Sequence, residues 1–157
     1  MERRRKQKSD RASQNPSPHI IVTNRQSALS LDPASVRRLV NLFLAHYQIS
    51  CERVSVFFVG KRKIAQLHKK FFNDPSPTDC MTFPIDQTFL GECVICPRVA
   101  LEVNPSKPYE EASHYLIHSL LHLIGYDDID KKKQATMRKE EYKLLKLARK
   151  SRCLLEP

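Results

Sequence analysis

The stretch HSLLHLIGYDD, residues 118–128, constrains the structure of this chain more than any other. Its two histidines are four residues apart, so on a helix their Cβ atoms lie about 5–6 Å apart on one face and both imidazoles can reach one metal ion. Gly125 is well placed to end this helix, because glycine adopts the left-handed conformation of a C-terminal cap without a steric penalty. The chain can then turn back and bring Asp127 or Asp128 toward the histidine pair.

Two histidines and one carboxylate form a three-ligand site that leaves a position for water, as a catalytic Zn²⁺ requires. The same donors resemble a non-haem iron triad, but nothing else in the sequence points to binding of oxygen or an oxoacid, so we rank hydrolysis higher. A zincin protease is disfavoured, because Ser119 replaces the glutamate that follows its first histidine and Leu121 replaces the glutamate of the inverted motif. The sequence therefore predicts a hydrolytic metal site at the end of a helix.

The positive charge of the chain lies at its two ends. Residues 1–19 hold six Lys or Arg against two acidic residues, residues 131–157 hold ten against three, and the net charge of the chain is +10. A nearly neutral body with basic ends predicts contact with a polyanion, and nucleic acid is a better candidate than a membrane. The alternative is that the basic ends are only a solubilising tail and a solvated helix. Residues 1–18 lack apolar periodicity, so we expect a disordered basic tail there and a single folded domain over residues 19–157.

The five cysteines are odd in number, and the chain shows neither a secretory signal nor an apolar run of about 18 residues. We therefore expect a reduced, cytoplasmic protein that does not contact a membrane. Cys93 and Cys96 match a C-x-x-C pattern, but a zinc ribbon needs a second such pair. We interpret both as strand residues, which would point to opposite faces of a sheet.

Apolar periodicity and helix-capping residues predict the order of helices and strands. We expect strands at 19–24, 53–59, 80–84 and 92–96, and helices at 33–48, 61–72, 97–103, 108–124 and after residue 130. Asp32, Ser106 and Asp130 are the expected N-caps, and residues 87–91 an expected turn. This order predicts an α+β (mixed α/β) fold in which about five helices pack on a small mixed four-stranded sheet.

Three stretches together resemble the YbeY-type endoribonucleases, the bacterial rRNA maturation factors. The histidine motif is similar to the family signature HGxLHLxGYDH, residues 77–84 (PTDCMTFP) to its PTDVLSFP loop and strand, and residues 90–97 (LGECVICP) to its LGDIVICP strand. The resemblance covers about residues 20–150. It implies a zinc-dependent, single-strand-specific RNA endonuclease that acts in 16S rRNA processing and ribosome quality control, with rRNA and the ribosome or ribosomal proteins as partners.

The resemblance also implies which residues bind the metal. The family's third metal histidine falls on Asp128, and Asp127 matches the family aspartate, so we expect one Zn²⁺ on His118, His122 and Asp128. Aspartate adds a negative charge, which should leave a metal-bound water less acidic than at a three-histidine site. His114, one turn before His118, is a rival third ligand and a candidate to line the site.

Other residues of the active site are predicted less directly. Thr78 and Asp79 match the family loop and are candidates to line the site. The alternative is that they only cap and form the turn. The family usually has an arginine, thought to handle the RNA phosphate, where this chain has Phe72, and Lys69 or Lys70 are candidates to replace it. No residue stands out as general base, and the nucleophile can be hydroxide or the RNA's own 2′-OH.

The alternative from another class is a non-catalytic rRNA- or ribosome-binding factor with a structural or degenerate metal site, which Asp128 and Phe72 favour. A metal-dependent hydrolase for another substrate is third. Metal removal discriminates the first two, because a structural site ties metal to folding more tightly than a catalytic one.

Overall fold

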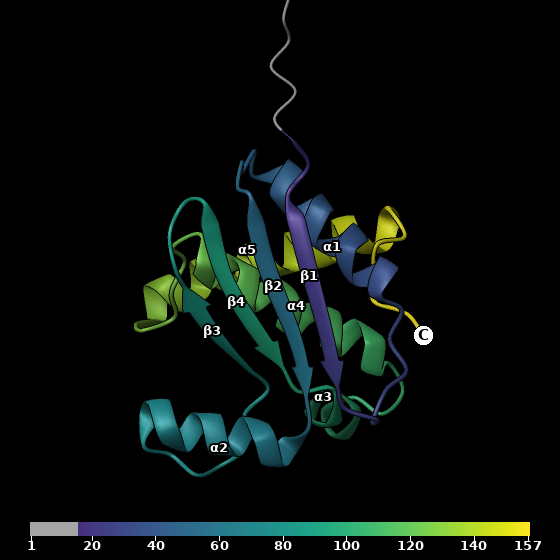
Figure 1. The fold of residues 1–157 in the computed structure, drawn as a ribbon. Coiled ribbons are helices and arrows are strands. Elements are labelled where there is room, and N and C mark those ends of the chain that lie inside the picture. Colours follow the sequence, from purple (N-terminus) through teal and green to yellow (C-terminus); the bar gives the residue numbers. More distant parts are fainter. Residues whose placement is uncertain (1–15) are drawn as a thin grey trace, which may run out of the picture.

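The computed structural model describes residues 16–157, so the predicted tail lies almost wholly outside the described residues and stays a prediction. Along the chain the structure runs β1 (His19–Arg25), α1 (Pro33–His46), β2 (Arg53–Val59), α2 (Lys61–Phe72), β3 (Cys80–Pro84), β4 (Phe89–Ile95), α3 (Pro97–Val103), α4 (Pro108–Leu123) and α5 (Lys131–Lys150). The predicted α+β fold is confirmed (Figure 1). No helix in the described part of the chain has both the length and the apolarity that a membrane span needs.

The four strands form one mixed sheet in the order β1-β2-β4-β3. β1 pairs with β2 and β2 with β4 in parallel, whereas β3 is an edge strand that pairs with β4 antiparallel. The two parallel connections therefore pass through helices, and β3 joins β4 by a short turn. This topology places the loop before β3 beside the helices that follow β4.

The turn predicted at residues 87–91 is wrong, because β4 already begins at Phe89. The Asp86 carboxylate accepts hydrogen bonds from the backbone N–H groups of Thr88 and Phe89, both at 2.7 Å, and closes the turn earlier. Gly91 is needed inside the strand, since a Cβ there would lie 2.4 Å from the carbonyl oxygen of Phe83. The glycine marks close packing rather than a turn.

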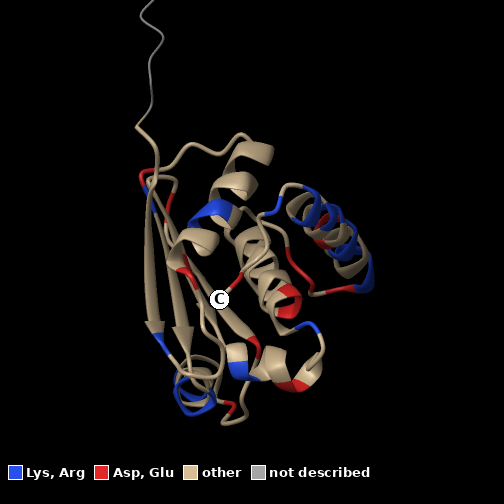
Figure 2. Cartoon of the chain, turned by 90° about the vertical axis from the view of Figure 1, so that its right-hand side faces the viewer, with Lys and Arg blue, Asp and Glu red and all other residues tan. Residues whose placement is uncertain are grey.

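The helices cover mainly one face of the sheet. In the side-on view, α1 and α4 pack on this face, and α5 packs on their side that points away from the sheet (Figure 2). α2 lies across the lower end of the sheet. α4 is enclosed between β3, β4, α3 and α5, and four of its apolar side chains are fully buried: Leu116, Ile117, Leu120 and Leu121. Burying each such side chain contributes about 1.5–3 kcal/mol to folding. α4 is therefore anchored in the main core, and it carries both histidines of the motif.

The predicted N-caps are confirmed for two helices and wrong for one. Asp32 accepts a hydrogen bond from the N–H of Ala34, and Asp130 accepts one from the N–H of Lys133. Ser106 does not cap α4, because its hydroxyl donates to the side chain of Asn104. α4 begins instead with a proline, whose fixed φ suits the first position of a helix and which has no N–H to satisfy.

The two cysteines of the C-x-x-C pattern lie in separate apolar clusters. Cys93 is in β4 and is buried in the main core, whereas Cys96 follows the strand and packs with Val59, Ile64 and Met81 under α2. All five cysteines of the chain are free. The interpretation as a strand residue is confirmed for Cys93 and is wrong for Cys96, which is the N-cap residue of α3.

Candidate metal centre

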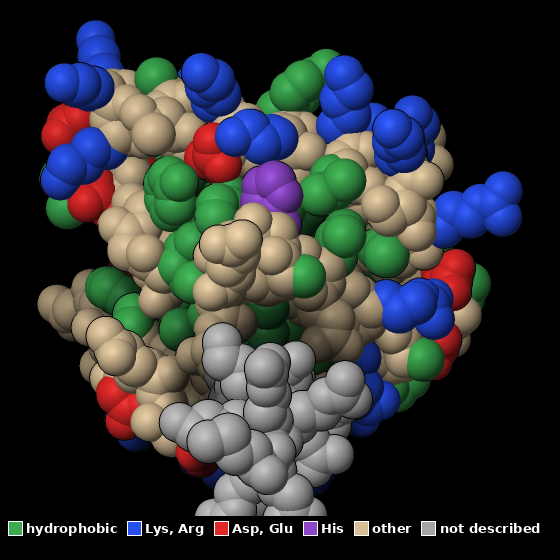
Figure 3. Space-filling view, turned by 90° about the horizontal axis from the view of Figure 1, so that it is seen from above, with side chains coloured by type: hydrophobic (Ala, Val, Ile, Leu, Met, Phe, Trp, Pro, Cys, Tyr) green, Lys and Arg blue, Asp and Glu red, His purple; other side chains and the backbone are tan. Residues whose placement is uncertain are grey.

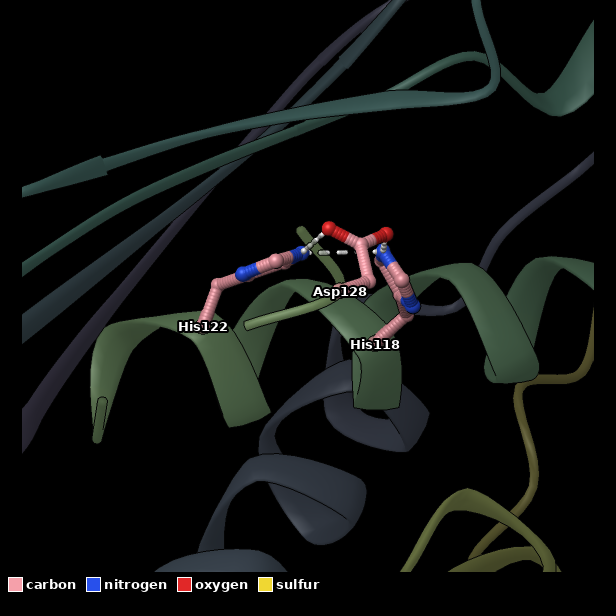
Figure 4. A group of neighbouring side chains, drawn as sticks. All are labelled: His118, His122 and Asp128. Atoms are coloured by element: carbon pink, nitrogen blue, oxygen red, sulfur yellow. Dashed lines mark hydrogen bonds and ion pairs between the residues drawn. The ribbon is translucent and has the colours of Figure 1, made fainter. Parts of the chain in front are cut away.

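The two histidines of α4 face each other at the end of the helix. Nε2 of His118 lies 3.1 Å from Nε2 of His122, and the two rings are nearly perpendicular. α4 then stops as predicted: Gly125 has a φ of 101° and its N–H donates to the carbonyl oxygen of His122. The chain turns back toward the two rings. Oδ2 of Asp128 lies 3.9 Å from Nε2 of His118, and Oδ1 lies 3.9 Å from Nε2 of His122 (Figure 4). We call His118, His122 and Asp128 the metal group.

The far side of each ring fixes its tautomer. Nδ1 of His118 is hydrogen-bonded to the Glu141 carboxylate, and Nδ1 of His122 lies 3.0 Å from the carbonyl oxygen of Tyr126. Both partners can only accept, so each Nδ1 carries the proton and each Nε2 of a neutral ring presents a lone pair. Two lone pairs 3.1 Å apart repel each other unless a proton or a metal cation lies between them.

The metal group fits a divalent cation in spacing and in donor type. Ligands at about 2.0–2.1 Å from a tetrahedral Zn²⁺ are about 3.3 Å from one another. The observed nitrogen–nitrogen distance of 3.1 Å and nitrogen–oxygen distances of 3.9 Å bracket this value, and one ligand atom from each residue lies within 4.8 Å of the others. Three such donors leave room for a fourth ligand.

Of the two aspartates that the sequence offered, the structure brings only Asp128 to the histidines. Asp127 turns toward the start of α5, where its carboxylate lies 3.1 Å from Nζ of Lys133 and accepts a hydrogen bond from the N–H of Ile129. The hydrogen bond with Lys133 lowers the pKa of Asp127. The two neighbouring carboxylates therefore have separate surroundings.

His114 does not enter the metal group, and a glutamate explains why. Nε2 of His114 lies 3.0 Å from one carboxylate oxygen of Glu141, while the other oxygen accepts from His118. Glu141 is only 7% exposed; burial raises its pKa, but the hydrogen bonds to His114 and His118 outweigh burial and lower it to about 2. The same bond raises the pKa of His114, against its partial burial. Glu141 is thus a buried carboxylate that stays ionised.

Sequence analysis missed Glu141, although a signal existed. The residue interrupts the apolar stripe of α5, whose other buried members are Met137, Leu144 and Ala148 at helical spacing. A carboxylate on the buried face of a helix needs a charged partner. The position of Glu141 therefore predicted such a partner on the element that packs against α5.

A cavity of about 460 Å³, which we call the main cavity, opens beside the metal group. Its lining also includes Thr78 and Asp79 from the loop before β3 and His68 and Phe72 from α2. The side chains of Thr78 and Asp79 also hold this loop, since Asp79 accepts from the hydroxyl of Thr78 and from the N–H of Cys80. Both predicted lining residues therefore border the cavity and also stabilise the turn.

Neither lysine considered as a replacement for the family arginine lines the main cavity. Lys70 borders a separate apolar groove on the open side of the sheet, where its Nζ lies 5.3 Å from the ring centre of Phe71. His68 is the α2 residue with an ionisable side chain that borders the main cavity, and it lies within the helix predicted over residues 61–72.

A second cavity of about 250 Å³, the side cavity, lies on the other flank of the metal group. It shares His118, Asp128 and Asp79 with the main cavity, and α5 supplies the exposed Arg138 to its wall. His114 lines this cavity. The metal group therefore lies between the two cavities. Phe72 borders the main cavity, and the guanidinium group of Arg138 borders the side cavity.

Comparison with known proteins gives a consistent result. A family model described as endoribonuclease YbeY matches residues 21–149. The endoribonuclease YbeY of Chlamydia muridarum is 39% identical over 152 residues, which cover 90% of this chain and 94% of the relative, and that of Chlamydia trachomatis is 38% identical over the same coverage. The endoribonuclease YbeY of Protochlamydia amoebophila is 37% identical over 78% of this chain and 87% of its own.

A solved structure resembles the fold. The solution structure of TM1509 from Thermotoga maritima superposes with a TM-score of 0.58 over 81% of this chain and 87% of that protein, at 23% sequence identity. At this identity the likeness concerns the fold alone.

Proposed function

The chain belongs to the endoribonuclease YbeY family, and on this premise we propose that it is a zinc-dependent, single-strand-specific endoribonuclease of rRNA processing. The family assignment makes it an enzyme that hydrolyses RNA. The observation that carries the metal dependence is the pair of unprotonated Nε2 atoms 3.1 Å apart beneath the Asp128 carboxylate. His118, His122 and Asp128 would hold the ion. When bound, Zn²⁺ supplies Lewis-acid activation of the nucleophile and of the phosphodiester.

Hydrogen bonds from behind the metal group hold its two imidazoles in the orientation that metal binding requires. The ionised carboxylate of Glu141 accepts from Nδ1 of His118, and the carbonyl oxygen of Tyr126 accepts from Nδ1 of His122. Such partners fix the orientation and tautomer of a metal-binding imidazole and increase its basicity. Because the carboxylate is buried against α4, we expect the histidine geometry to exist before metal binds.

The preference for single strands follows from the aromatic ring at the main cavity. Phe72 is 63% exposed and borders the same cavity as the metal group. An exposed ring offers a stacking surface to a base, but only an unpaired base can turn its face to it. A duplex would leave this ring without a partner.

The basic side chains of α5 supply electrostatic attraction for the RNA backbone. All are exposed, and they are Lys131, Lys132, Lys133, Arg138, Lys139, Lys143, Lys146, Arg149 and Lys150. Blue ribbon segments, which mark Lys and Arg, concentrate on α2 and α5 in the side-on view (Figure 2). Lys and Arg side chains gather along one edge of the molecule seen from above (Figure 3). RNA binding should therefore weaken steeply with added salt.

We extend the proposal to rRNA as the substrate and to the ribosome or its proteins as partners, in line with the resemblance of the motifs. The free state of all five cysteines supports the predicted cytoplasmic location. A single folded domain over residues 19–157 is part of the same proposal.

The decisive test measures zinc content and cleavage of single-stranded RNA after ion-exchange purification removes contaminating nucleases. The proteins are wild type, Asp128→Ala and Asp128→His. We expect zinc and cleavage to fall together in the alanine variant and to return in the histidine variant. A wild type that binds no zinc and cuts no RNA would instead support the non-catalytic rRNA-binding factor.

Removal of the metal with a chelator distinguishes a catalytic site from a structural one. The core closes around α4 without any metal ligand inside it, so removal of zinc should abolish cleavage but leave the protein folded by circular dichroism. Unfolding on chelation would indicate a structural site.

A further inference from the structure

We propose that His68 is a further catalytic residue of this endoribonuclease, which donates a proton to the oxygen that leaves when the phosphodiester is cleaved. The inference rests on the proposed function, because it requires RNA in the main cavity beside the metal group. His68 belongs to α2 and borders that cavity, as His118, His122 and Asp128 do. It lies 50 residues before His118 in the chain, outside the histidine motif.

Outside the metal group, His68 is the imidazole among the side chains that border the main cavity. The other lining residues outside the metal group are apolar, hydroxyl-bearing, a thiol or the carboxylate of Asp79, and none of the lining residues is Lys or Arg. Burial raises the pKa of the Cys80 thiol well above its usual value, so this thiol keeps its proton. Imidazole is the side chain that most often serves as general acid in enzymes.

Contacts on the far side of the ring hold His68 in a defined orientation. Its Nδ1 lies 2.9 Å from the carbonyl oxygen of Ser76, which can only accept, so Nδ1 carries a proton. The loop that presents this carbonyl is itself fixed, because Asp74 accepts from the N–H and the hydroxyl of Ser76. This arrangement leaves Nε2 as the ring nitrogen available to a ligand.

Two neighbours border the ring of His68. The Asp74 carboxylate lies 3.9 Å from its Nδ1. The ring of Phe72 lies against His68 with centroids 5.7 Å apart. The other titratable groups that border the cavity are Asp79, Cys80 and the metal group itself. A base stacked on Phe72 would bring its phosphate beside Nε2 of His68.

The chemical step balances without a further reactant. The nucleophile, water or the 2′-OH, forms a bond to phosphorus and releases its proton to solvent. The bond between phosphorus and the leaving oxygen breaks, and its electron pair stays on that oxygen, which takes the proton from Nε2 and departs as an alcohol. The ring is then reprotonated from solvent. Because an alkoxide is a poor leaving group, such a donor typically accelerates cleavage by about 10²–10⁴-fold.

The test compares two leaving groups in His68→Gln. The product termini of wild type identify the leaving oxygen, and a second substrate then carries sulfur at that bridging position, since a thiolate departs without a proton. We expect His68→Gln to lower kcat for ordinary RNA by about 10²–10⁴-fold and to cleave the sulfur substrate at close to the wild-type rate. Zinc affinity and the Kd for a non-cleavable RNA should stay unchanged.

Two further variants sharpen the result. His46→Gln makes the same change at an exposed histidine at the end of α1, which lies outside both cavities, and should match wild type on both substrates. His68→Arg keeps a positive charge but holds its protons too tightly to donate, so it should stay as slow as His68→Gln on ordinary RNA.

Other outcomes overturn the assignment. An equal loss on both substrates, or recovery in His68→Arg, would make His68 a phosphate-binding residue. A loss of zinc affinity would make it part of the metal site, and full activity of His68→Gln would make it a bystander. A wild type inactive with zinc bound would overturn the proposed function, and the role of His68 with it.

Discussion

The two walls of the main cavity are held in different ways. The wall with His118 and His122 belongs to α4, a helix enclosed by the sheet, α3 and α5, and the buried carboxylate of Glu141 supports it from behind. The opposite wall comes from α2 and the loop after it, where Phe72 is largely exposed and a hydrogen bond to a backbone carbonyl orients His68.

The two walls should tolerate sequence changes to different degrees. A change on the α4 wall disturbs the packing of the core as well as the metal group, so few substitutions are tolerated there. A change on the α2 wall alters contacts with the substrate and leaves the core intact. The departure from the family arginine at Phe72 falls on this second wall. Asp128 belongs to the loop after α4, but its carboxylate lies beside the two histidines of the α4 wall.

The largest effect should come from removing a donor of the α4 wall. His118→Ala deletes one of the two unprotonated nitrogens, so zinc should be lost and cleavage should fall by more than about 10³-fold, as measured by metal analysis and single-stranded RNA cleavage. His114→Gln is the matched control, because His114 bonds to Glu141 rather than to the metal group. Equal loss of zinc in both variants would make His114 the third ligand and contradict Asp128.

The next effect tests the support behind that wall. Glu141→Gln keeps the size of the side chain but removes the charge that accepts from His118, so zinc should bind about 10–100-fold more weakly. The measurement is competition with a zinc chelator of known affinity. Glu140→Gln is the control at the adjacent position, where the carboxylate bonds to Tyr47 and Lys143 instead. Unchanged zinc affinity in Glu141→Gln would show that the metal group does not depend on this carboxylate.

The comparison also explains what could be predicted from the sequence. The α4 wall is encoded locally: a histidine spacing of four, a terminating glycine at 125 and an aspartate within the next turn all lie in one stretch. Helices and strands were predicted for the same reason, since burial of one face imposes a period on neighbouring residues. The early start of β4 could not be predicted, because it depends on the hydrogen bonds of Asp86, which close the turn before Gly91.

The rest depends on contacts between residues far apart in the chain. Glu141 meets His118 across 23 positions and His68 faces the metal group across about 50, so no local pattern reports either pairing. Glu141 left a trace as a charge on an apolar stripe, but His68 left none, because a histidine on the half-buried face of a helix is usually explained by packing alone.

A smaller effect is expected on the α2 wall. Phe72→Ala removes the stacking surface and should weaken binding of a non-cleavable single-stranded RNA by about 1–3 kcal/mol, with zinc affinity unchanged. Phe71→Ala is the neighbouring control: this ring is also exposed, at 52%, but it packs on Phe83 and borders the apolar groove on the open side of the sheet. An equal loss in both variants would mean that RNA lies on the open sheet face rather than in the main cavity.

The smallest effect concerns the side cavity, which lies beyond the α4 wall. Arg138 borders this cavity beside His118 and Asp128, so a phosphate that leaves the metal group on this flank would meet its guanidinium. Arg138→Ala should weaken RNA binding by a few-fold and lower the slope of log K against log salt by about 0.7, the value for one contact with a single strand. Lys139→Ala removes the same charge from the adjacent position of α5, which borders neither cavity. If α5 attracts RNA only through its overall charge, the two variants will behave alike; a larger loss in Arg138→Ala would instead trace the path of the strand through the side cavity.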